Sequence, residues 1–166
     1  MISESALMNS AAEARFRVQE PNSKARITKV IALDVPSDEV VRGLADGSWN
    51  GASFLTASAL SNGPERGQDG WLRDINGNPR DLIDEVNAAD LVVMIATPGG
   101  RARAAALIGE ACSNKRVMTT ALIAGTGHAS EEELSKTLAQ LRPWSLMVVI
   151  ASVDDYIKDL LTALRA

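Results

Sequence analysis

The chain alternates short apolar runs with helix-forming segments, and this alternation restricts its fold more than any other feature of the sequence. Each run is four to seven residues long, short enough for a buried strand. The five runs cover residues 30–33, 52–57, 91–96, 118–124 and 146–151. Buried strands that alternate with helices form a parallel sheet covered on both faces. The sequence therefore predicts an α/β, three-layer Rossmann-like domain with a mainly parallel sheet of about five strands.

Composition excludes several classes of partner. The 166 residues are 46% hydrophobic and carry a net charge of −4, and no block of Lys or Arg stands out. Nucleic acid and anionic membranes are therefore poor candidate partners. No apolar run approaches the roughly 18 residues of a membrane span, and the N-terminus lacks the order of a signal peptide. The single Cys112 allows no internal disulfide and no zinc pattern, which favours a cytoplasmic location.

Two polar segments flank or interrupt the predicted domain. Residues 1–26 form an arm, either helical or disordered, which could serve self-association; residues 27–166 form the domain. Residues 61–80 are dense in Gly, Asn, Asp and Pro, with a turn at Asn76-Gly77. Loops of this length are usually functional or mobile. Trp71, near the middle of this loop, is a candidate lid or partner contact.

The first strand ends at Asp34-Val35-Pro36-Ser37-Asp38-Glu39. Ligands of open parallel sheets bind beyond the carboxyl ends of the strands, where a dinucleotide-binding domain has a glycine-rich turn. Here the turn has no glycine and three carboxylates. Helix capping, with Ser37 as the N-cap, is the simpler interpretation; metal binding by Asp34 and Asp38 is the alternative.

The turn Thr97-Pro98-Gly99-Gly100-Arg101-Ala102-Arg103 is a better candidate for an anion site. The two glycines permit close backbone approach, and the following helix adds a partial positive charge at its N-terminus. Arg101 and Arg103 could supply fork-shaped donors to phosphate or another small anion. The alternative is a plain strand-to-helix connection with solvated arginines.

Two further residues carry potential chemistry. His128 lies in a glycine-containing loop after the fourth apolar run, where it could act as a general acid–base. Because no nucleophile or metal partner is recognisable, a solvated loop histidine is the alternative. Cys112 falls late in an apolar helix and is most simply a core thiol.

The order of segments resembles the nucleotide-binding domain of the tubulin and bacterial FtsZ family over residues 27–155. The stretches that carry the resemblance are ITKVIALDVPSDEVVRGLADGSWNGASFLTASAL, NAADLVVMIATPGGRARAAALIGEA, VMTTALIAG and LRPWSLMVVIASVDD. The family's first loop is glycine-rich and its signature loop reads G-G-G-T-G-[ST]-G. Here the first loop reads DVPSDE, and TPGGRAR keeps only Gly99 and Gly100. The resemblance therefore implies a degenerate, truncated relative without the GTP loops, in which GTP hydrolysis by the family route is not expected.

These observations predict a non-catalytic interaction or regulatory domain that needs no cofactor. It would bind at most a small anion at Thr97, Gly99, Gly100, Arg101 and Arg103, and its partner would be another protein or a second copy of the chain. The alternative is a small cytoplasmic enzyme that acts on a phosphorylated or carboxylated metabolite, with His128 as the candidate catalytic residue.

Overall fold

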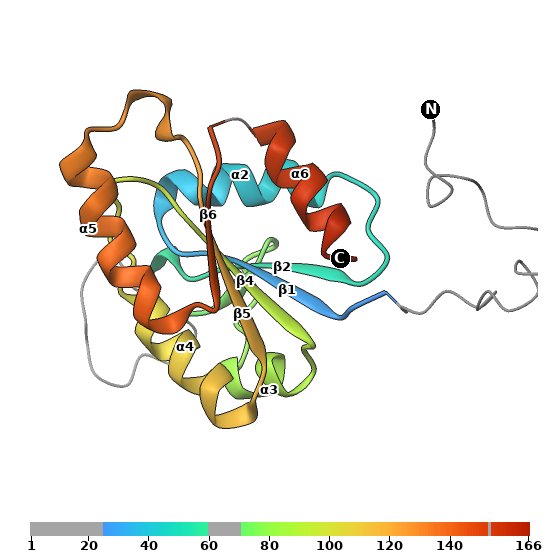
Figure 1. Ribbon diagram of the computed structural model, residues 1–166. Helices are drawn as coiled ribbons and strands as arrows, with labels where there is room; N and C mark the ends of the chain where they lie inside the picture. Colours follow the sequence, from blue (N-terminus) through green and yellow to red (C-terminus); the bar gives the residue numbers. More distant parts are fainter. Residues whose placement is uncertain (1–24, 60–70, 153) are drawn as a thin grey trace, which may run out of the picture.

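The computed structural model describes residues 25–59, 71–152 and 154–166 and shows a mostly parallel sheet with helices on both faces (Figure 1). The strands are β1 (Thr28–Ala32), β2 (Ala52–Thr56), β3 (Arg73–Asp74), β4 (Leu91–Ala96), β5 (Met118–Ile123) and β6 (Met147–Ile150). The helices are α2 (Val35–Ala45), α3 (Leu82–Asn87), α4 (Ala104–Lys115), α5 (Glu131–Leu141) and α6 (Asp154–Ala163), with short 3₁₀ helices η3 (Thr126–His128) and η4 (Arg142–Trp144). The predicted three-layer α/β class is confirmed. Residues 1–24 of the predicted arm and 61–70 of the predicted loop lie outside the described residues.

The strands lie in the order β3-β2-β1-β4-β5-β6, and every neighbouring pair except β2–β3 is parallel. The five apolar runs of the sequence correspond to the other five strands and do not predict β3. The two residues of β3, Arg73 and Asp74, are both charged. It precedes a turn in which the Gly77 N–H donates to the Asp74 carbonyl (3.0 Å) and Gly77 has a φ of +85°. The turn predicted at Asn76-Gly77 is therefore present.

The chain changes direction across the sheet between β1 and β4. From β1 it proceeds outward to β2 and β3, and from β4 it proceeds the other way to β5 and β6. The register places Ala32 beside both Thr56 and Ile95, so β1, β2 and β4 end at the same edge. The loops after β1 and β4 consequently diverge from neighbouring points, which is the arrangement at which open α/β sheets bind their ligands.

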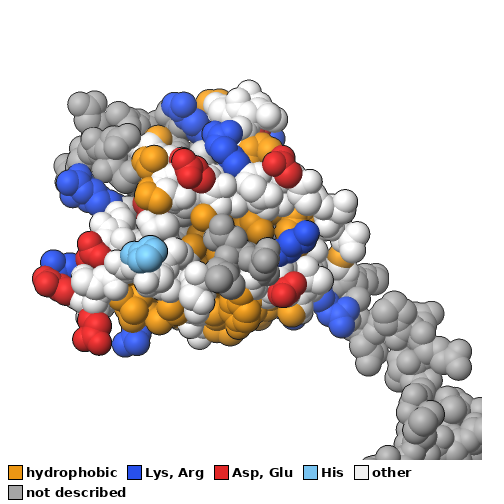
Figure 2. Space-filling view, turned by 90° about the horizontal axis from the view of Figure 1, so that it is seen from above, with side chains coloured by type: hydrophobic (Ala, Val, Ile, Leu, Met, Phe, Trp, Pro, Cys, Tyr) orange, Lys and Arg blue, Asp and Glu red, His pale blue; other side chains and the backbone are white. Residues whose placement is uncertain are grey.

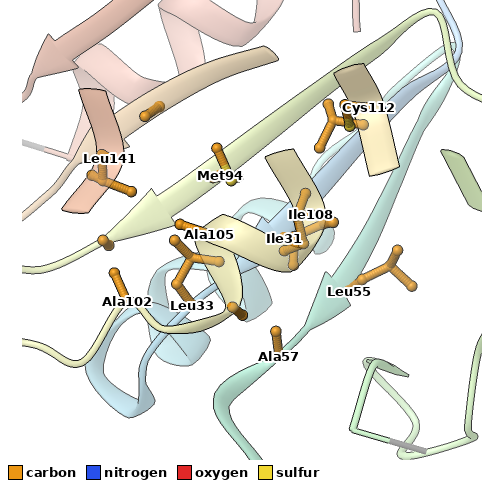
Figure 3. Close-up of a cluster of buried hydrophobic side chains, with 14 of the residues drawn as sticks. Ile31, Leu33, Leu55, Ala57, Met94, Ala102, Ala105, Ile108, Cys112 and Leu141 are labelled. Carbon is orange, nitrogen blue, oxygen red and sulfur yellow. The ribbon is translucent and has the colours of Figure 1, made fainter. Parts of the chain in front are cut away.

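Alternate residues of the central strands point into two separate cores. On one face Ile31 and Met94 pack with Ile108 of α4 and with Leu141 (Figure 3). On the other face Val93 and its neighbours pack against α2 and α6, whose buried residues include Val41, Ile157 and Leu161. All six residues of β4 are buried, because this strand has parallel neighbours on both sides and helices on both faces. The continuous apolar run in the sequence reflects that position.

Helix starts follow the capping residues in most places. Ser130 and Glu133 form a capping box at the start of α5, and the Asp81 side chain accepts a hydrogen bond from the Asp84 N–H at the start of α3 (3.0 Å). The helix that follows Thr97–Arg103 begins at Ala104, eight residues after the end of β4. The intervening residues form a turn, which is described below.

A glycine inside α4 lets a tryptophan approach the helix backbone. A Cβ atom on Gly109 would lie 2.4 Å from the Trp144 Cβ, closer than two carbon atoms can approach. Gly43, inside α2, has no atom within 4 Å of the equivalent position. The two helical glycines therefore differ in what they contribute, since only Gly109 is required by packing.

We expect opposite effects from the same substitution at these two glycines. Gly109→Ala should lower the free energy of unfolding by about 1–3 kcal/mol, because the new methyl group overpacks the contact with Trp144. Gly43→Ala should raise it by about 0.5–1 kcal/mol, because alanine loses less backbone entropy in a helix. Urea denaturation of both variants measures the difference. Equal effects of the two substitutions would contradict this account of Gly109.

Candidate functional site

The Asp34 carboxylate occupies the junction between the loops that follow β1 and β4. Its Oδ1 accepts a hydrogen bond from the Ser37 N–H at 2.9 Å. Its Oδ2 accepts two more, from the Thr97 N–H at 2.8 Å and the Thr97 hydroxyl at 3.0 Å. The residue is only 3% exposed. Three donors, one from the first turn of α2 and two from the loop after β4, therefore converge on one nearly buried side chain.

Asp34 also caps α2, which corrects the expectation that Ser37 is the N-cap. Ser37 is the third residue of the helix, and its hydroxyl accepts a hydrogen bond from the Asp34 N–H at 3.1 Å. The two residues thus form a reciprocal capping box. The helix starts at Val35 because Pro36, which lacks an N–H, fits the first helical turn, where no intrahelical donor is needed. The partial positive charge at the N-terminus of α2 is directed at a carboxylate of the protein itself.

Four backbone N–H groups of the turn between β4 and α4 bond within the protein. Besides Thr97, the Gly99 N–H donates to the Thr137 hydroxyl (3.1 Å) and the Gly100 N–H to the Thr97 carbonyl (3.0 Å). The Ala102 N–H donates to the Gln140 side-chain oxygen at 2.9 Å. Two of these acceptors lie on α5, which sequence reasoning did not connect with the turn. These four N–H groups of the turn therefore already have acceptors.

The structure explains why both Gly99 and Gly100 of the turn are glycines. Gly99 adopts a φ of +77°, a backbone conformation that other residues rarely adopt. A Cβ atom on Gly100 would lie 2.1 Å from Asp34 Oδ2. The close approach that Gly100 permits is therefore to a carboxylate of the protein.

Arg101 and Arg103 are the residues of this turn that could still bind an anion. Both are exposed, and within the described part of the chain neither forms an ion pair. Arg103 is the N-cap of α4 and makes no side-chain capping hydrogen bond. A groove of about 500 Å³ lies beside them, with walls that include Trp144. The predicted anion site thus consists of two guanidinium groups at a groove, beside a turn in which the N–H groups of Thr97, Gly99 and Gly100 are already bonded.

A second carboxylate, that of Asp38, bonds to hydroxyl groups near the end of β2. Asp38, in the first turn of α2, accepts hydrogen bonds from the hydroxyls of Thr56 and Ser58, the latter at 2.6 Å. Asp34 and Asp38 therefore each bond to different protein donors. Among the described residues, no group of three or more His, Cys, Asp or Glu side chains is placed to hold a metal ion.

His128 lies at the end of η3 on the face of the molecule shown in Figure 2, where it is exposed. Within the described residues no hydrogen bond or ion pair joins it to the turn at Thr97–Arg103. The nearby contact is structural, because the Thr126 hydroxyl donates to the Ala151 carbonyl (3.3 Å) and connects the loops that follow β5 and β6. The structure thus places the candidate acid–base residue at the same sheet edge, where no described residue forms a hydrogen bond or ion pair that would activate it.

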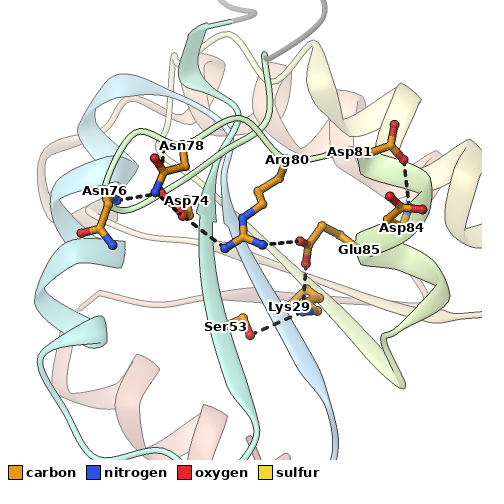
Figure 4. Close-up of polar contacts among 9 residues, drawn as sticks. All are labelled: Lys29, Ser53, Asp74, Asn76, Asn78, Arg80, Asp81, Asp84 and Glu85. Carbon is orange, nitrogen blue, oxygen red and sulfur yellow. Dashed lines mark hydrogen bonds and ion pairs between the residues drawn. The ribbon is translucent and has the colours of Figure 1, made fainter.

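A polar network fixes the described end of the long loop to the sheet (Figure 4). Lys29 on β1 forms an ion pair with Glu85 on α3 (2.8 Å), and Arg80 contacts both Glu85 and Asp74. Hydrogen bonds from Asn78 and Asn76 and the contact with Arg80 outweigh partial burial and lower the pKa of Asp74. These residues hold the Asp74–Arg80 turn and give it a structural role. Trp71, expected as a lid or partner contact, is half-buried against the core that includes Leu72.

The comparisons identify no family. No protein-family model matches the chain, and no curated protein matches it. Among solved structures, translation elongation factor SelB from Methanococcus maripaludis, in its apo form, is similar with a TM-score of 0.47 and 11% sequence identity. The match covers 83% of this chain and 36% of SelB, so the chain spans about a third of that protein. The FtsZ-like ancestry stays a prediction. No helix in the described residues is long and apolar enough to cross a membrane.

Cys112 is a core thiol, as the sequence predicts. Its side chain is fully buried on α4 among the residues of the first core. Burial raises the pKa of the Cys112 thiol to about 11, because the charged thiolate is disfavoured away from water.

Removal of the Asp34 side chain should affect both loops at once. We expect Asp34→Ala to lower the free energy of unfolding by about 2–4 kcal/mol, since it removes a helix cap and leaves the half-buried Thr97 donors without acceptors. Gly100→Ala should be destabilising in the native background and clearly less so beside Asp34→Ala, because the carboxylate that its Cβ would meet is gone. A double-mutant cycle measured by urea denaturation gives the coupling, expected in the range of about 0.5–3 kcal/mol. Additive effects would contradict the contact.

Cys112 should be unreactive while the protein is folded. At pH 8 a thiol with a pKa of about 11 is ionised in about one molecule per thousand, and only the thiolate reacts. A chromogenic disulfide reagent should therefore label the native protein only as fast as it unfolds, and label it at once in urea. Rapid labelling of the folded protein would show that the thiol is accessible.

Proposed function

We propose that this chain is a non-catalytic interaction or regulatory domain, in which the Asp34 carboxylate takes the place that a bound phosphate would have in a nucleotide-binding relative. The observation that supports the proposal is the set of three hydrogen bonds from the two loops at the β1–β4 junction to this side chain. The donors are of the kind that hold phosphate oxygens, namely a helix N-terminal N–H, a loop N–H and a hydroxyl.

Electrostatics favours the same proposal. A phosphate at the N-terminus of α2 would lie beside Asp34, the N-cap, and Asp38, in the first turn, with Glu39 one residue further along the helix. Two like charges 4 Å apart near a protein surface repel by about 4 kcal/mol. A nucleotide would therefore have to displace Asp34 from its donors and then tolerate the remaining carboxylates. GTP hydrolysis is not expected of such a site.

A small anion is compatible with the proposal at a different place. Arg101 and Arg103 stand at the uncapped start of α4, beside the groove with Trp144. A phosphate or carboxylate could bind there to the guanidinium groups without entering the β1–β4 junction. Such binding would be weak, because the backbone donors of the turn are already engaged.

The alternative proposal, a small enzyme acting on a phosphorylated or carboxylated metabolite, rests on Arg101 and His128 reaching one substrate. Both lie in loops that follow parallel strands, β4 and β5. If the chain has such an activity, Arg101→Ala and His128→Ala should each abolish it, and activity that survives both would contradict this alternative.

A ligand panel tests the proposal. We expect GTP, GDP, ATP, NAD and flavin, with or without magnesium, to leave the melting temperature unchanged. A nucleotide at a hundred times its dissociation constant would stabilise the fold by about 2.7 kcal/mol, or several degrees. Simple phosphate at high concentration should give a small shift that Arg101→Ala removes and Lys158→Ala, an exposed control on α6, retains. A magnesium-dependent shift with GTP would contradict the loss of the nucleotide site.

The Asp34→Gly variant makes the test sharper. It removes the carboxylate and leaves the three donors without an acceptor, so formate or phosphate should restore part of the lost stability in this variant. The same anions should not stabilise the native protein to that extent. Absence of any rescue would contradict the idea that Asp34 occupies an anion site.

A further inference from the structure

The two edge strands of the sheet, β3 and β6, differ in length and in charge. The β3 edge consists of two charged residues, Arg73 and Asp74, and a bridge from Arg73 to Pro79 covers part of it. The other edge is β6, which lies last in the sheet and, among the described strands, pairs with β5 alone. Charged and very short edge strands prevent pairing with other chains. Only the β3 edge has these protections.

The β6 edge is uncharged and apolar over its whole length. Residues 146–151 read Leu-Met-Val-Val-Ile-Ala, without a charge, a proline or a glycine. Leu146 is 78% exposed, Met147 39% and Ile150 46%, and Met118 beside them at the start of β5 is also exposed. Hydrophobic side chains gather at the lower margin of the face in Figure 2, on the side of the molecule where β6 and α6 lie. We call Met118, Leu146, Met147 and Ile150 the β6 strip.

The backbone of β6 also has N–H and C=O groups that no other described strand pairs with. In a parallel ladder, successive residues direct their N–H and C=O groups alternately to the two sides of the strand. Among the described strands, β6 has a neighbour on one side only, so half of its backbone groups face away from the sheet. Water satisfies them in a monomer, and a second strand would satisfy them while it covers the apolar side chains.

We propose that β6 pairs antiparallel with β6 of a second copy of this chain, so that two six-stranded sheets join into one. A two-fold axis beside an edge strand brings that strand against itself in the antiparallel direction, and each contact then occurs twice. Because alternate side chains of a strand point to opposite faces, residues that meet across the axis share a face. With Val148 beside the axis, Ile150 lies opposite the partner's Leu146, and Met147 lies opposite the partner's Val149. Both ends are apolar, so the strand is complementary to itself.

The surface area and the adjacent groove fit this partner. At roughly 200 Å² for a large exposed side chain, the β6 strip leaves about 400 Å² of apolar surface, half of the roughly 800 Å² per partner in a standard interface. The strand backbone and the half-buried Val148 and Val149 add to it. A groove of about 390 Å³ lies beside Leu146 and Met118, with Trp144 in its wall. Antiparallel pairing brings the partner's Ile150 to this end of the strand.

The inference adds the partner and the surface to the proposed interaction domain, and it is tested separately from that proposal. Sedimentation velocity of the full chain should show a concentration-dependent dimer with twice the mass of the chain. Ile150→Lys and Met147→Lys should each weaken the dimer at least about 100-fold, because a lysine charge would be buried against an apolar strand. The matched control is Ile83→Lys on α3, which starts from the same residue type at 44% exposure and should leave the dimer unchanged.

Amide hydrogen exchange identifies the strand involved and needs no variant. The outward N–H groups of β6 should exchange more slowly as the protein concentration rises, whereas those of β3 should not change. A chain that stays monomeric at several hundred micromolar would overturn the inference. So would a dimer that persists in both lysine variants, or one whose β6 exchange is independent of concentration. None of these results alters the expectation for nucleotides, which depends on Asp34.

Discussion

The hydrogen bonds of the Asp34 carboxylate are the interaction on which the rest of the candidate site depends. They join the loop after β1 to the loop after β4, at the one place where the chain reverses its direction across the sheet. The same side chain caps α2 and requires Gly100 to lack a Cβ atom. A single carboxylate thus sets the start of a helix, the path of the opposite loop and the identity of a residue 66 positions away in the chain.

The turn at Thr97–Arg103 takes its shape from these constraints and from α5. Thr137 and Gln140 accept hydrogen bonds from Gly99 and Ala102, so the turn is held on both sides before α4 begins at Ala104. A loop built to bind a phosphate has to keep its N–H groups available for the ligand. Here the protein itself supplies acceptors for these N–H groups. The side chains of Arg101 and Arg103 take no part in these hydrogen bonds. The arginines and the glycines, adjacent in the sequence, therefore serve different purposes.

The sequence predicts the layers of this fold well because they depend on local patterns. The apolar run 91–96 coincides with β4, and Ser130 with Glu133 marks the start of α5, since strand burial and capping are properties of neighbouring residues. The contacts that decide the site are of another kind. Asp34 and Thr97 are 63 residues apart, and Gly99 and Thr137 are 38 apart. A glycine in a turn indicates close approach but does not tell what approaches, which is why Gly100 is equally typical of a phosphate loop and of a carboxylate contact.

An open α/β sheet has two places where polar backbone groups lack partners inside the domain: the loops at the carboxyl ends of its strands and its two edge strands. In ligand-binding members of this architecture the first place is completed by the ligand. In this chain the β1–β4 junction is completed by Asp34, and the β3 edge is shortened and charged. Among the described residues, the unprotected part that remains is β6, where the exposed side chains are also apolar. Natural sheets protect such an edge when pairing would be harmful, so an edge left uncharged in the same sheet as a protected one supports the proposed pairing at β6.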